Sequence, residues 1–217
     1  MNKNLNLKKI EKISTLAFDN GLRLHFDSIL LFFNKSWPSA FHLSILAMEE
    51  FGKAKWCDSF VFYTSPLENR DAEEENKWLK LLYNHREKQC AFIEEEIFNY
   101  PPKFFDLVKG GGLEKAKQYA TYVGLRKNKD KIEISGKIYY PQRIRKEKSK
   151  RQITLINDYL LDLISGKISG KYLVDNEKTE SKLNRKLLNK LKSIWPHQNK
   201  KRDYYKTYFK KWKKLKT

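Results

Sequence analysis

Hydrophobic residues recur every three or four positions along most of this chain, which is the spacing of amphipathic helices. The pattern predicts a short helix over residues 113–123 and longer helices over residues 8–34, 37–63, 73–99 and 144–163. Residues 131–140 alternate between polar and apolar instead, which predicts a strand pair turning at Ser135-Gly136. The predicted fold is therefore mostly α: an antiparallel helical bundle with a small β-hairpin inserted among the helices.

Glycine and proline mark the breaks between these elements. Trp37-Pro38 separates the first two helices. The run Gly110-Gly-Gly112 lacks the preceding strand and the following Lys-Ser/Thr of a phosphate-binding loop, so we interpret it as a flexible joint. Residues 165–170 have the composition of a hinge. The predicted organisation is a helical domain over residues 1–165 and a basic, aromatic-rich helical extension over residues 166–217.

One carboxylate falls on the apolar face of the second helix. At about 100° per residue, the stripe within residues 43–61 has Glu50 at its centre. The third helix likewise carries His85 within its apolar stripe. Because an ionised side chain in such a position costs several kcal/mol unless a partner pairs with it, we expect Glu50 and His85 to face one another.

Such a pair has the parts for general acid–base chemistry, since a carboxylate can orient an imidazole and favour its protonated form. Lys53 and Lys88 each follow one member of the pair by three residues, where they would stabilise the charge of a phosphate. The polar lining of the cleft is assigned to Asn20, Asp27 and Glu49, although Glu49, like Arg86, lies off the stripes and is interpreted as solvated. The alternative is that the same residues form a closed polar network that only fixes helix packing.

The run Leu43-Ser-Ile-Leu-Ala-Met-Glu-Glu-Phe-Gly-Lys-Ala54, followed by His85-Arg-Glu-Lys88, resembles the signature of the AbiV family of abortive-infection proteins, a branch of the HEPN helical superfamily. Ala17-Phe-Asp-Asn20, continuing to His25-Phe-Asp27, and Tyr119-Ala-Thr-Tyr122-Val123 extend the resemblance, which covers roughly residues 9–165. It implies a HEPN-like helical domain and a toxic activity that stays silent until infection. It also implies a homodimer with its site at the subunit interface.

The chain departs from one HEPN pattern. Many HEPN ribonucleases carry an Arg a few residues before a His, and no such run exists here. Arg23 precedes His25 by only two positions, and Arg185 precedes His197 by twelve. The standard ribonuclease assignment is therefore not transferred to any residue of this chain.

The net charge of +19 is concentrated in the second half of the chain. Residues 126–151 hold eleven bases against three acids, and residues 182–217 hold fourteen bases against one acid. Such a field points to RNA, an anionic surface or an acidic partner protein, while a lysine-rich solvated surface without a ligand has the same composition. The candidate RNA-binding residues are Arg143, Arg145, Lys206, Lys210, Lys211 and Trp212.

The last of these residues belong to a predicted helix over residues 203–215, with aromatic side chains on one face and lysines on the other. Three uses fit this pattern. The aromatic face would dock on the domain core, lie on an anionic membrane, or stack with RNA bases beside phosphate-binding lysines.

Several classes of protein are disfavoured. No apolar run has the length of a membrane span, and the N-terminal residues lack the apolar segment of an export signal, so we expect a cytoplasmic protein without an integral membrane segment. Cys57 and Cys90 fit buried free thiols. Two cysteines and four histidines without close pairing form no zinc signature, and we expect neither a metal nor a cofactor.

These observations favour antiphage defence by abortive infection, through an effector that acts on RNA and arrests translation. The predicted activity is metal-independent RNA cleavage with His85 as base or acid. The alternative is a non-enzymatic interaction module that binds RNA, or a phage or host protein, through its basic surface. RNA and a phage-encoded activator are the expected partners.

Overall fold

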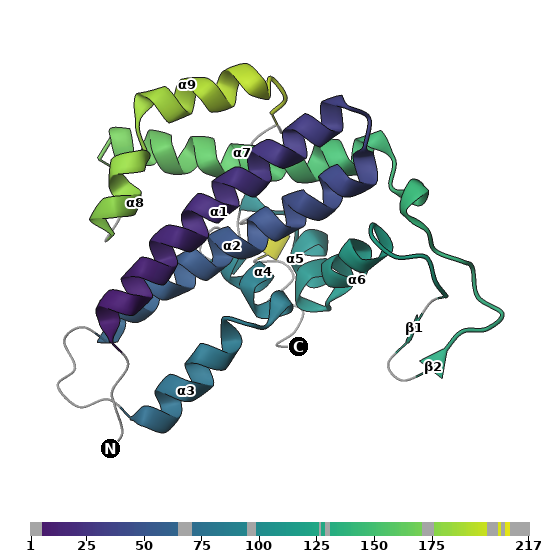
Figure 1. Cartoon of the computed structure of the whole chain (residues 1–217), viewed down its shortest axis with the longest axis horizontal. Helices are drawn as coiled ribbons and strands as arrows, with labels where there is room; N and C mark the ends of the chain where they lie inside the picture. Colours follow the sequence, from purple (N-terminus) through teal and green to yellow (C-terminus); the bar gives the residue numbers. More distant parts are fainter. Residues whose placement is uncertain are drawn as a thin grey trace.

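A computed structural model of the chain describes residues 6–64, 71–94, 99–125, 127–128, 131–170, 176–198, 204 and 207–208. These residues are mostly helical, which confirms the predicted fold class (Figure 1). None of the helices among them is long and apolar enough to cross a membrane.

Two long helices, α1 (Leu7–Phe33) and α2 (Trp37–Thr64), form an antiparallel hairpin and confirm the first two predicted helices. The Asn6 side chain caps α1 by accepting a hydrogen bond from the backbone N–H of Lys8. The chain reverses between the helices at Lys35, whose φ of 61° is left-handed.

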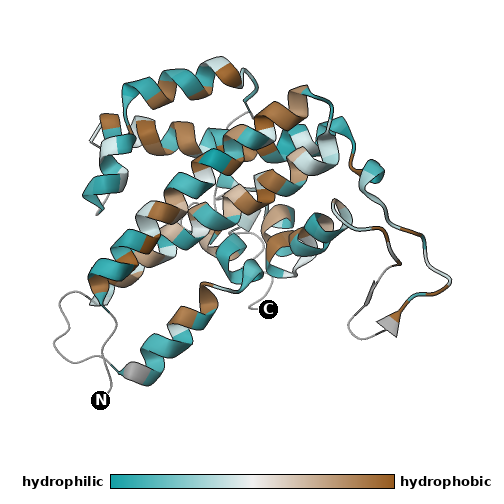
Figure 2. Ribbon diagram, in the orientation of Figure 1, coloured by the Kyte–Doolittle hydropathy of each residue, from teal (hydrophilic) through white to brown (hydrophobic). Residues whose placement is uncertain are grey.

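Helix α2 lies at the centre of the bundle and contacts α1, α4, α6 and α7. Its Phe51 is fully buried, 5.4 Å from the ring of Phe18 and 5.8 Å from the ring of Tyr159, measured between centroids. Figure 2 shows the contrast with the periphery, where α3 and α9 are mostly hydrophilic. The central position of α2 matters for the site, because its buried surface faces several helices and is wider than one stripe.

The prediction of one helix over residues 73–99 is wrong. The chain forms α3 (Ala72–Leu81) and α4 (His85–Glu94), separated by a short turn. The reason is Asn84, whose side-chain oxygen accepts hydrogen bonds from the backbone N–H groups of Arg86 and Glu87 and so starts a new helix. His85 is therefore the first residue of α4, not a residue in mid-helix.

Two short helices follow, α5 (Pro102–Lys109) and α6 (Gly112–Tyr119). The sequence pattern missed α5, and α6 overlaps the helix predicted over residues 113–123 but ends four residues earlier. The residues interpreted as a flexible joint form the tight turn between these helices. Gly111 has a φ of +72°, a conformation that glycine adopts at little cost.

The structure has a small β-hairpin among the helices, but the strand pair predicted within residues 131–140 is wrong. Strand β1 (Lys127–Asn128) pairs antiparallel with β2 (Lys131–Ile132), so Ser135-Gly136 follows the hairpin and does not close it. An antiparallel bridge between Gly124 and Tyr139 closes the base of this arm, which extends away from the bundle in Figure 1. The short 3-10 helix η2 (Pro141–Arg143) then leads back to the core.

The long helix α7 (Lys146–Ile168) packs on α1 and α2. It continues through residues 165–168, so the interpretation of these residues as part of a hinge is wrong. Helices α8 (Glu177–Lys182) and α9 (Arg185–Ile194) then fold back onto α1 and α7, where Leu183, Leu191 and Trp195 are buried.

Most of the predicted C-terminal helix lies outside the described residues. Tyr208 is described, and it is buried beside the ring of Phe105, at 6.4 Å between centroids. At this position the aromatic face of the segment contacts the bundle.

Candidate functional site

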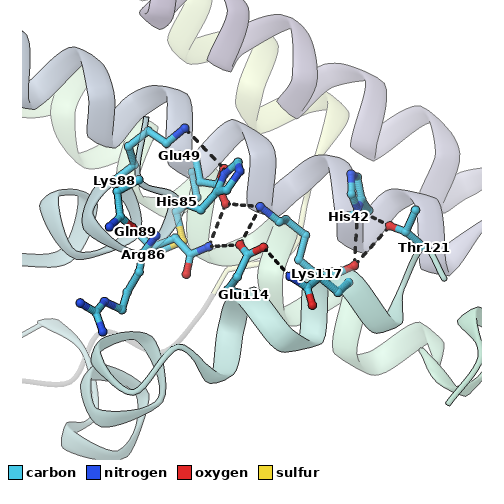
Figure 3. A network of polar contacts seen from close by, with 12 residues as sticks. His42, Glu49, His85, Arg86, Lys88, Gln89, Glu114, Lys117 and Thr121 are labelled. Atoms are coloured by element: carbon cyan, nitrogen blue, oxygen red, sulfur yellow. Dashed lines mark hydrogen bonds and ion pairs between the residues drawn. The ribbon is translucent and has the colours of Figure 1, made fainter. Parts of the chain in front are cut away.

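The site is built around the carboxylate of Glu49, which α2 places inside the bundle (Figure 3). This residue is 1 % exposed. Its Oε1 accepts hydrogen bonds from Lys117 Nζ and from Gln89 Nε2, both at 2.8 Å. Its Oε2 accepts one from His85 Nδ1 at 2.6 Å and lies 3.9 Å from Lys88 Nζ. We call these five residues the Glu49 network.

A glycine one turn further along α2 allows this arrangement. A Cβ built on Gly52 would lie 1.9 Å from the backbone oxygen of Lys88, so α2 and α4 touch through their backbones at this point. Glu49 precedes Gly52 by three residues and shares its side of the helix. The close approach therefore brings the carboxylate within hydrogen-bond reach of the first turns of α4.

The third wall of the site comes from α6. The Lys117 ammonium bridges two carboxylates, at 2.8 Å from Glu49 Oε1 and 2.7 Å from Glu114 Oε2. Its side chain is 6 % exposed, so this cation depends on the two acids for its pairing. The Glu114 side chain is more open and also accepts a hydrogen bond from Gln89 at 3.4 Å.

The buried charges of the site balance one another. Lys88 has an 8 % exposed side chain, and burial lowers its pKa while the negative charge of Glu49 opposes that shift. Glu50 and Lys53 lie close enough to Lys88 to act on the same pKa in opposite directions. Apart from His85, three carboxylates in this region thus accompany three ammonium groups: Glu49, Glu50 and Glu114 against Lys53, Lys88 and Lys117.

His85 joins the buried network to the surface. Its side chain is 50 % exposed, whereas that of Glu49 is 2 % exposed. A carboxylate that accepts from Nδ1 fixes the tautomer in which Nδ1 carries the proton, and the lone pair of Nε2 is then on the opposite edge of the ring. A neutral imidazole held in this way can take a proton from a substrate hydroxyl.

The structure corrects the acid expected from the sequence. Glu49, interpreted as solvated, is the buried partner of His85. Glu50, expected to face His85, accepts a hydrogen bond from Lys53 of its own helix at 2.7 Å. The physical reason is that α2 is covered on several sides, so the centre of its strongest apolar stripe does not identify the residue that faces α4.

The remaining predicted residues lie elsewhere. On α1, Asn20 and Asp27 accept hydrogen bonds from the exposed Arg23, and neither has a contact with Glu49 or His85 among the described residues. The Arg143 guanidinium lies over the rings of Tyr139 and Tyr140, at 5.6 and 5.1 Å from their centroids. Arg145 is exposed just before α7, while Lys206, Lys210, Lys211 and Trp212 fall outside the described part of the chain.

Sequence reasoning missed three members of the site, Gln89, Glu114 and Lys117. A signal for Lys117 was present, because it lies between Leu113 and Ala120 at helical spacing, and both of these residues are buried. A lysine on an apolar stripe predicts a buried acidic partner, because a buried ammonium group is costly without one. For Gln89 and Glu114 the chain carries no comparable pattern.

Three residues of the site have the chemistry of metal ligands. One ligand atom each from Glu49, His85 and Glu114 lies within 4.8 Å of the other two. The Lys117 ammonium already bridges both carboxylates, so a divalent cation there would have to displace it against charge repulsion. The geometry thus favours the lysine as the cation of this cluster.

A second histidine of the quoted motifs is structural. His25 is fully buried, with Nε2 3.1 Å from Oδ1 of Asn157 on α7. Burial lowers its pKa from the ordinary 6.5 to about 4, and the hydrogen bond to Asn157 only partly opposes this. His25 therefore stays neutral in the folded protein at neutral pH and ties α1 to α7.

The low pKa of His25 predicts a loss of stability in mild acid. Since the folded-state pKa lies below the unfolded value of 6.5, the stabilisation is complete above pH 6.5 and falls as the pH drops toward 4. Between pH 7 and pH 5 this residue should lower the free energy of unfolding by about 2 kcal/mol. Urea unfolding of wild type and of His25→Gln at both pH values measures it. An equal pH dependence in the two proteins would contradict the assignment.

Comparison with known proteins places the site in a family. Residues 9–162 match the model of AbiV, a HEPN-type family, and this span contains the whole Glu49 network. Searches of the curated proteins and of the solved structures found no match. AbiV membership implies a role in abortive infection, which is a defence against phage. Since the match covers well over half of the sequence, the chain belongs to the AbiV family of HEPN proteins.

Proposed function

We propose that this AbiV protein acts on RNA and cleaves it with His85 as the general base. The observation that carries the proposal is the hydrogen bond between His85 Nδ1 and the buried Glu49 carboxylate, combined with a half-exposed imidazole ring. A base needs a fixed tautomer and access to substrate, and His85 has both. The large positive charge of the chain supports an RNA substrate.

The reaction uses a nucleophile that RNA itself carries. Nε2 of His85 takes the proton of a ribose 2′-hydroxyl, and the resulting oxyanion attacks the adjacent phosphorus. The bond from phosphorus to the 5′ oxygen breaks as the new bond forms, which leaves a 2′,3′-cyclic phosphate. The departing oxygen takes a proton from water or from a second acid. Glu49 acts as a positioning residue that stabilises the imidazolium.

In this proposal Arg86 contacts the phosphate, in place of Lys53 and Lys88, which the sequence predicted for that role. Lys53 already pairs with Glu50, and Lys88 is buried beside Glu49. Arg86 follows His85, and its side chain is 52 % exposed; its ion pair with the adjacent Glu87, at 3.1 Å, lies at the surface, unlike the buried contact of Lys88 with Glu49. A guanidinium at this position can hold a phosphodiester with two N–H donors.

A homodimer, which the HEPN resemblance predicts, would complete the chemistry. One imidazole supplies only one half of acid–base catalysis, and a second copy would bring a second imidazole to the same substrate. The RNA substrate, the dimer and a phage-encoded activator all remain predictions.

The test is cleavage of total bacterial RNA by purified wild type and His85→Gln, in buffer with EDTA and without it. We expect His85→Gln to lower the cleavage rate at least about a hundredfold, which is the usual contribution of a general base. The matched control is His42→Gln, because His42 is a partly exposed histidine of α2 that bonds Thr121 rather than Glu49. It should keep the wild-type rate. Each assay is repeated with extract of phage-infected cells to supply any activator.

Equal cleavage by wild type and His85→Gln would refute the catalytic role of His85. If neither protein cleaves RNA and both bind it equally well, the results would favour a second candidate function. It is a non-enzymatic interaction module, favoured by the fact that Glu49 already accepts three hydrogen bonds in a network that also fixes helix packing. In that case His85→Gln should leave defence against phage intact whenever the variant folds.

A further inference from the structure

A polar pocket lies on a different part of the bundle from the Glu49 network. It has a volume of about 440 Å³ and is formed by the first half of α7 and by the segment that follows α9. That volume is in the range of sites for small ligands. Helices α4 and α6, which supply the partners of Glu49, contribute no residue to it. The lining residues are Glu147, Lys150, Arg151, Thr154, Pro196, His197 and Gln198.

The pocket has a fixed wall. Trp195 is 1 % exposed, and its Nε1 donates a hydrogen bond of 3.0 Å to Thr154 Oγ1. The same indole packs edge-on against Phe32 of α1, at 5.0 Å between centroids. The ring of His197 stands edge-on to Trp195 at 4.9 Å. The segment after α9 is therefore anchored, and His197 is held against the buried indole.

The charge of the pocket is positive. Lys150 and Arg151 come from adjacent positions of α7, and Glu147 is the one acid in the lining. Neither base forms an ion pair within the described part of the chain, in contrast to the paired lysines of the Glu49 network. Burial, with the positive charges of Lys150 and Lys146, lowers the pKa of His197. A pocket of unpaired cations favours an anion.

We propose that this pocket binds the phosphate group of a nucleotide, present either as a free mononucleotide or within a nucleic acid strand. Residues with a guanidinium, an ammonium, an imidazole and an amide line it, and all four groups can donate to phosphate oxygens. The volume leaves room for a sugar or base beside the phosphate. The proposal goes beyond the cleavage reaction and does not depend on His85.

The test is isothermal titration calorimetry on the full chain with two ligands, adenosine monophosphate and a 2′-O-methyl oligonucleotide of about eight residues. Neither ligand has a free 2′-hydroxyl beside a phosphodiester, so the proposed reaction cannot cleave them and its failure would leave this result unchanged. We expect Arg151→Gln to weaken binding about tenfold, which is the effect of losing one charge-assisted contact. Lys150→Gln is a second variant, and melting temperatures verify that both fold.

The matched control is Arg185→Gln, which makes the same change at an exposed position at the start of α9, about 14 Å along that helix from the pocket. It should bind as wild type does. Weaker binding by Arg151→Gln and Lys150→Gln only would support the proposal. Binding of adenosine monophosphate would identify a free nucleotide as the source of the phosphate, and binding of the oligonucleotide alone would identify a nucleic acid strand. Absence of binding by wild type, or equal binding by all four proteins, overturns it.

Discussion

Replacing Glu49 by Gln is expected to lower the free energy of unfolding by about 3 to 5 kcal/mol, the cost of removing the most buried acid from a set of buried ion pairs. The Lys117 and Lys88 side chains are 6 % and 8 % exposed, and Glu49 is an acid that both of them face. Glutamine has the same size but no charge, so the loss reports the ion pairs and not a cavity. Urea unfolding at neutral pH measures it.

The neighbouring acid provides a matched control. Glu50→Gln makes the same chemical change at the next residue, where the ion pair with Lys53 is a single contact within one helix. Its cost should stay below about 2 kcal/mol, because the two side chains keep some contact with solvent, at 16 % and 23 % exposed. Equal losses for the two variants would mean that Glu49 is no more important to the fold than Glu50, which would contradict the network described above.

A double variant separates the ion pair from the rest of the network. Glu49→Gln removes one of the two acids that pair with Lys117. Lys117→Met should therefore be less destabilising in the Glu49→Gln background than in wild type. A fully additive pair would show that the two side chains do not interact in solution. The comparison also keeps stability apart from catalysis, since Glu49 has both roles in the proposed reaction.

The sequence pattern predicted some elements closely and others poorly, for physical reasons. Helices α1 and α2 agree with their predicted ranges, because long amphipathic segments bounded by a polar turn have a clear periodicity. The apolar pattern does not show the break before α4, because the spacing of α3 continues past Leu82, which is buried at the turn. Only the cap formed by Asn84 divides the two helices, and an asparagine in a polar stretch is a weak signal.

The pattern predicted a carboxylate of α2 beside His85, and the residue in that position is Glu49 rather than Glu50. The residues of the run Glu49-Glu50-Phe51-Gly52-Lys53 make different contacts. Glu49 binds His85, Phe51 fills the core, and Gly52 admits α4, while Glu50 and Lys53 pair with one another. Periodicity ranks positions by the hydrophobicity of their neighbours, and it cannot tell which of two adjacent acids faces a polar partner on another helix.

Replacing Gly52 by Ala is expected to destabilise the protein by about 3 kcal/mol or more. Replacing a glycine inside a helix by alanine normally stabilises a protein by about 0.5 to 1 kcal/mol. At Gly52 we expect the opposite effect. The added Cβ would lie 1.9 Å from Lys88 O and 3.1 Å from the backbone nitrogen of Phe92, and backbone atoms cannot move aside as a side chain does. Helices α2 and α4 would have to separate. Urea unfolding measures the cost.

Separation of these helices would also lengthen the 2.6 Å contact between Glu49 and His85. If the proposed cleavage by His85 takes place, Gly52→Ala should therefore lower it as well as stability, even at a temperature where the variant is still folded. The control is Gly124→Ala, because a Cβ at that position meets no atom within 4 Å and the change should stay within about 0.5 kcal/mol. A stabilised Gly52→Ala with normal cleavage would show that α2 and α4 do not touch at this crossing, and the link between the motif and the geometry of His85 would then fail.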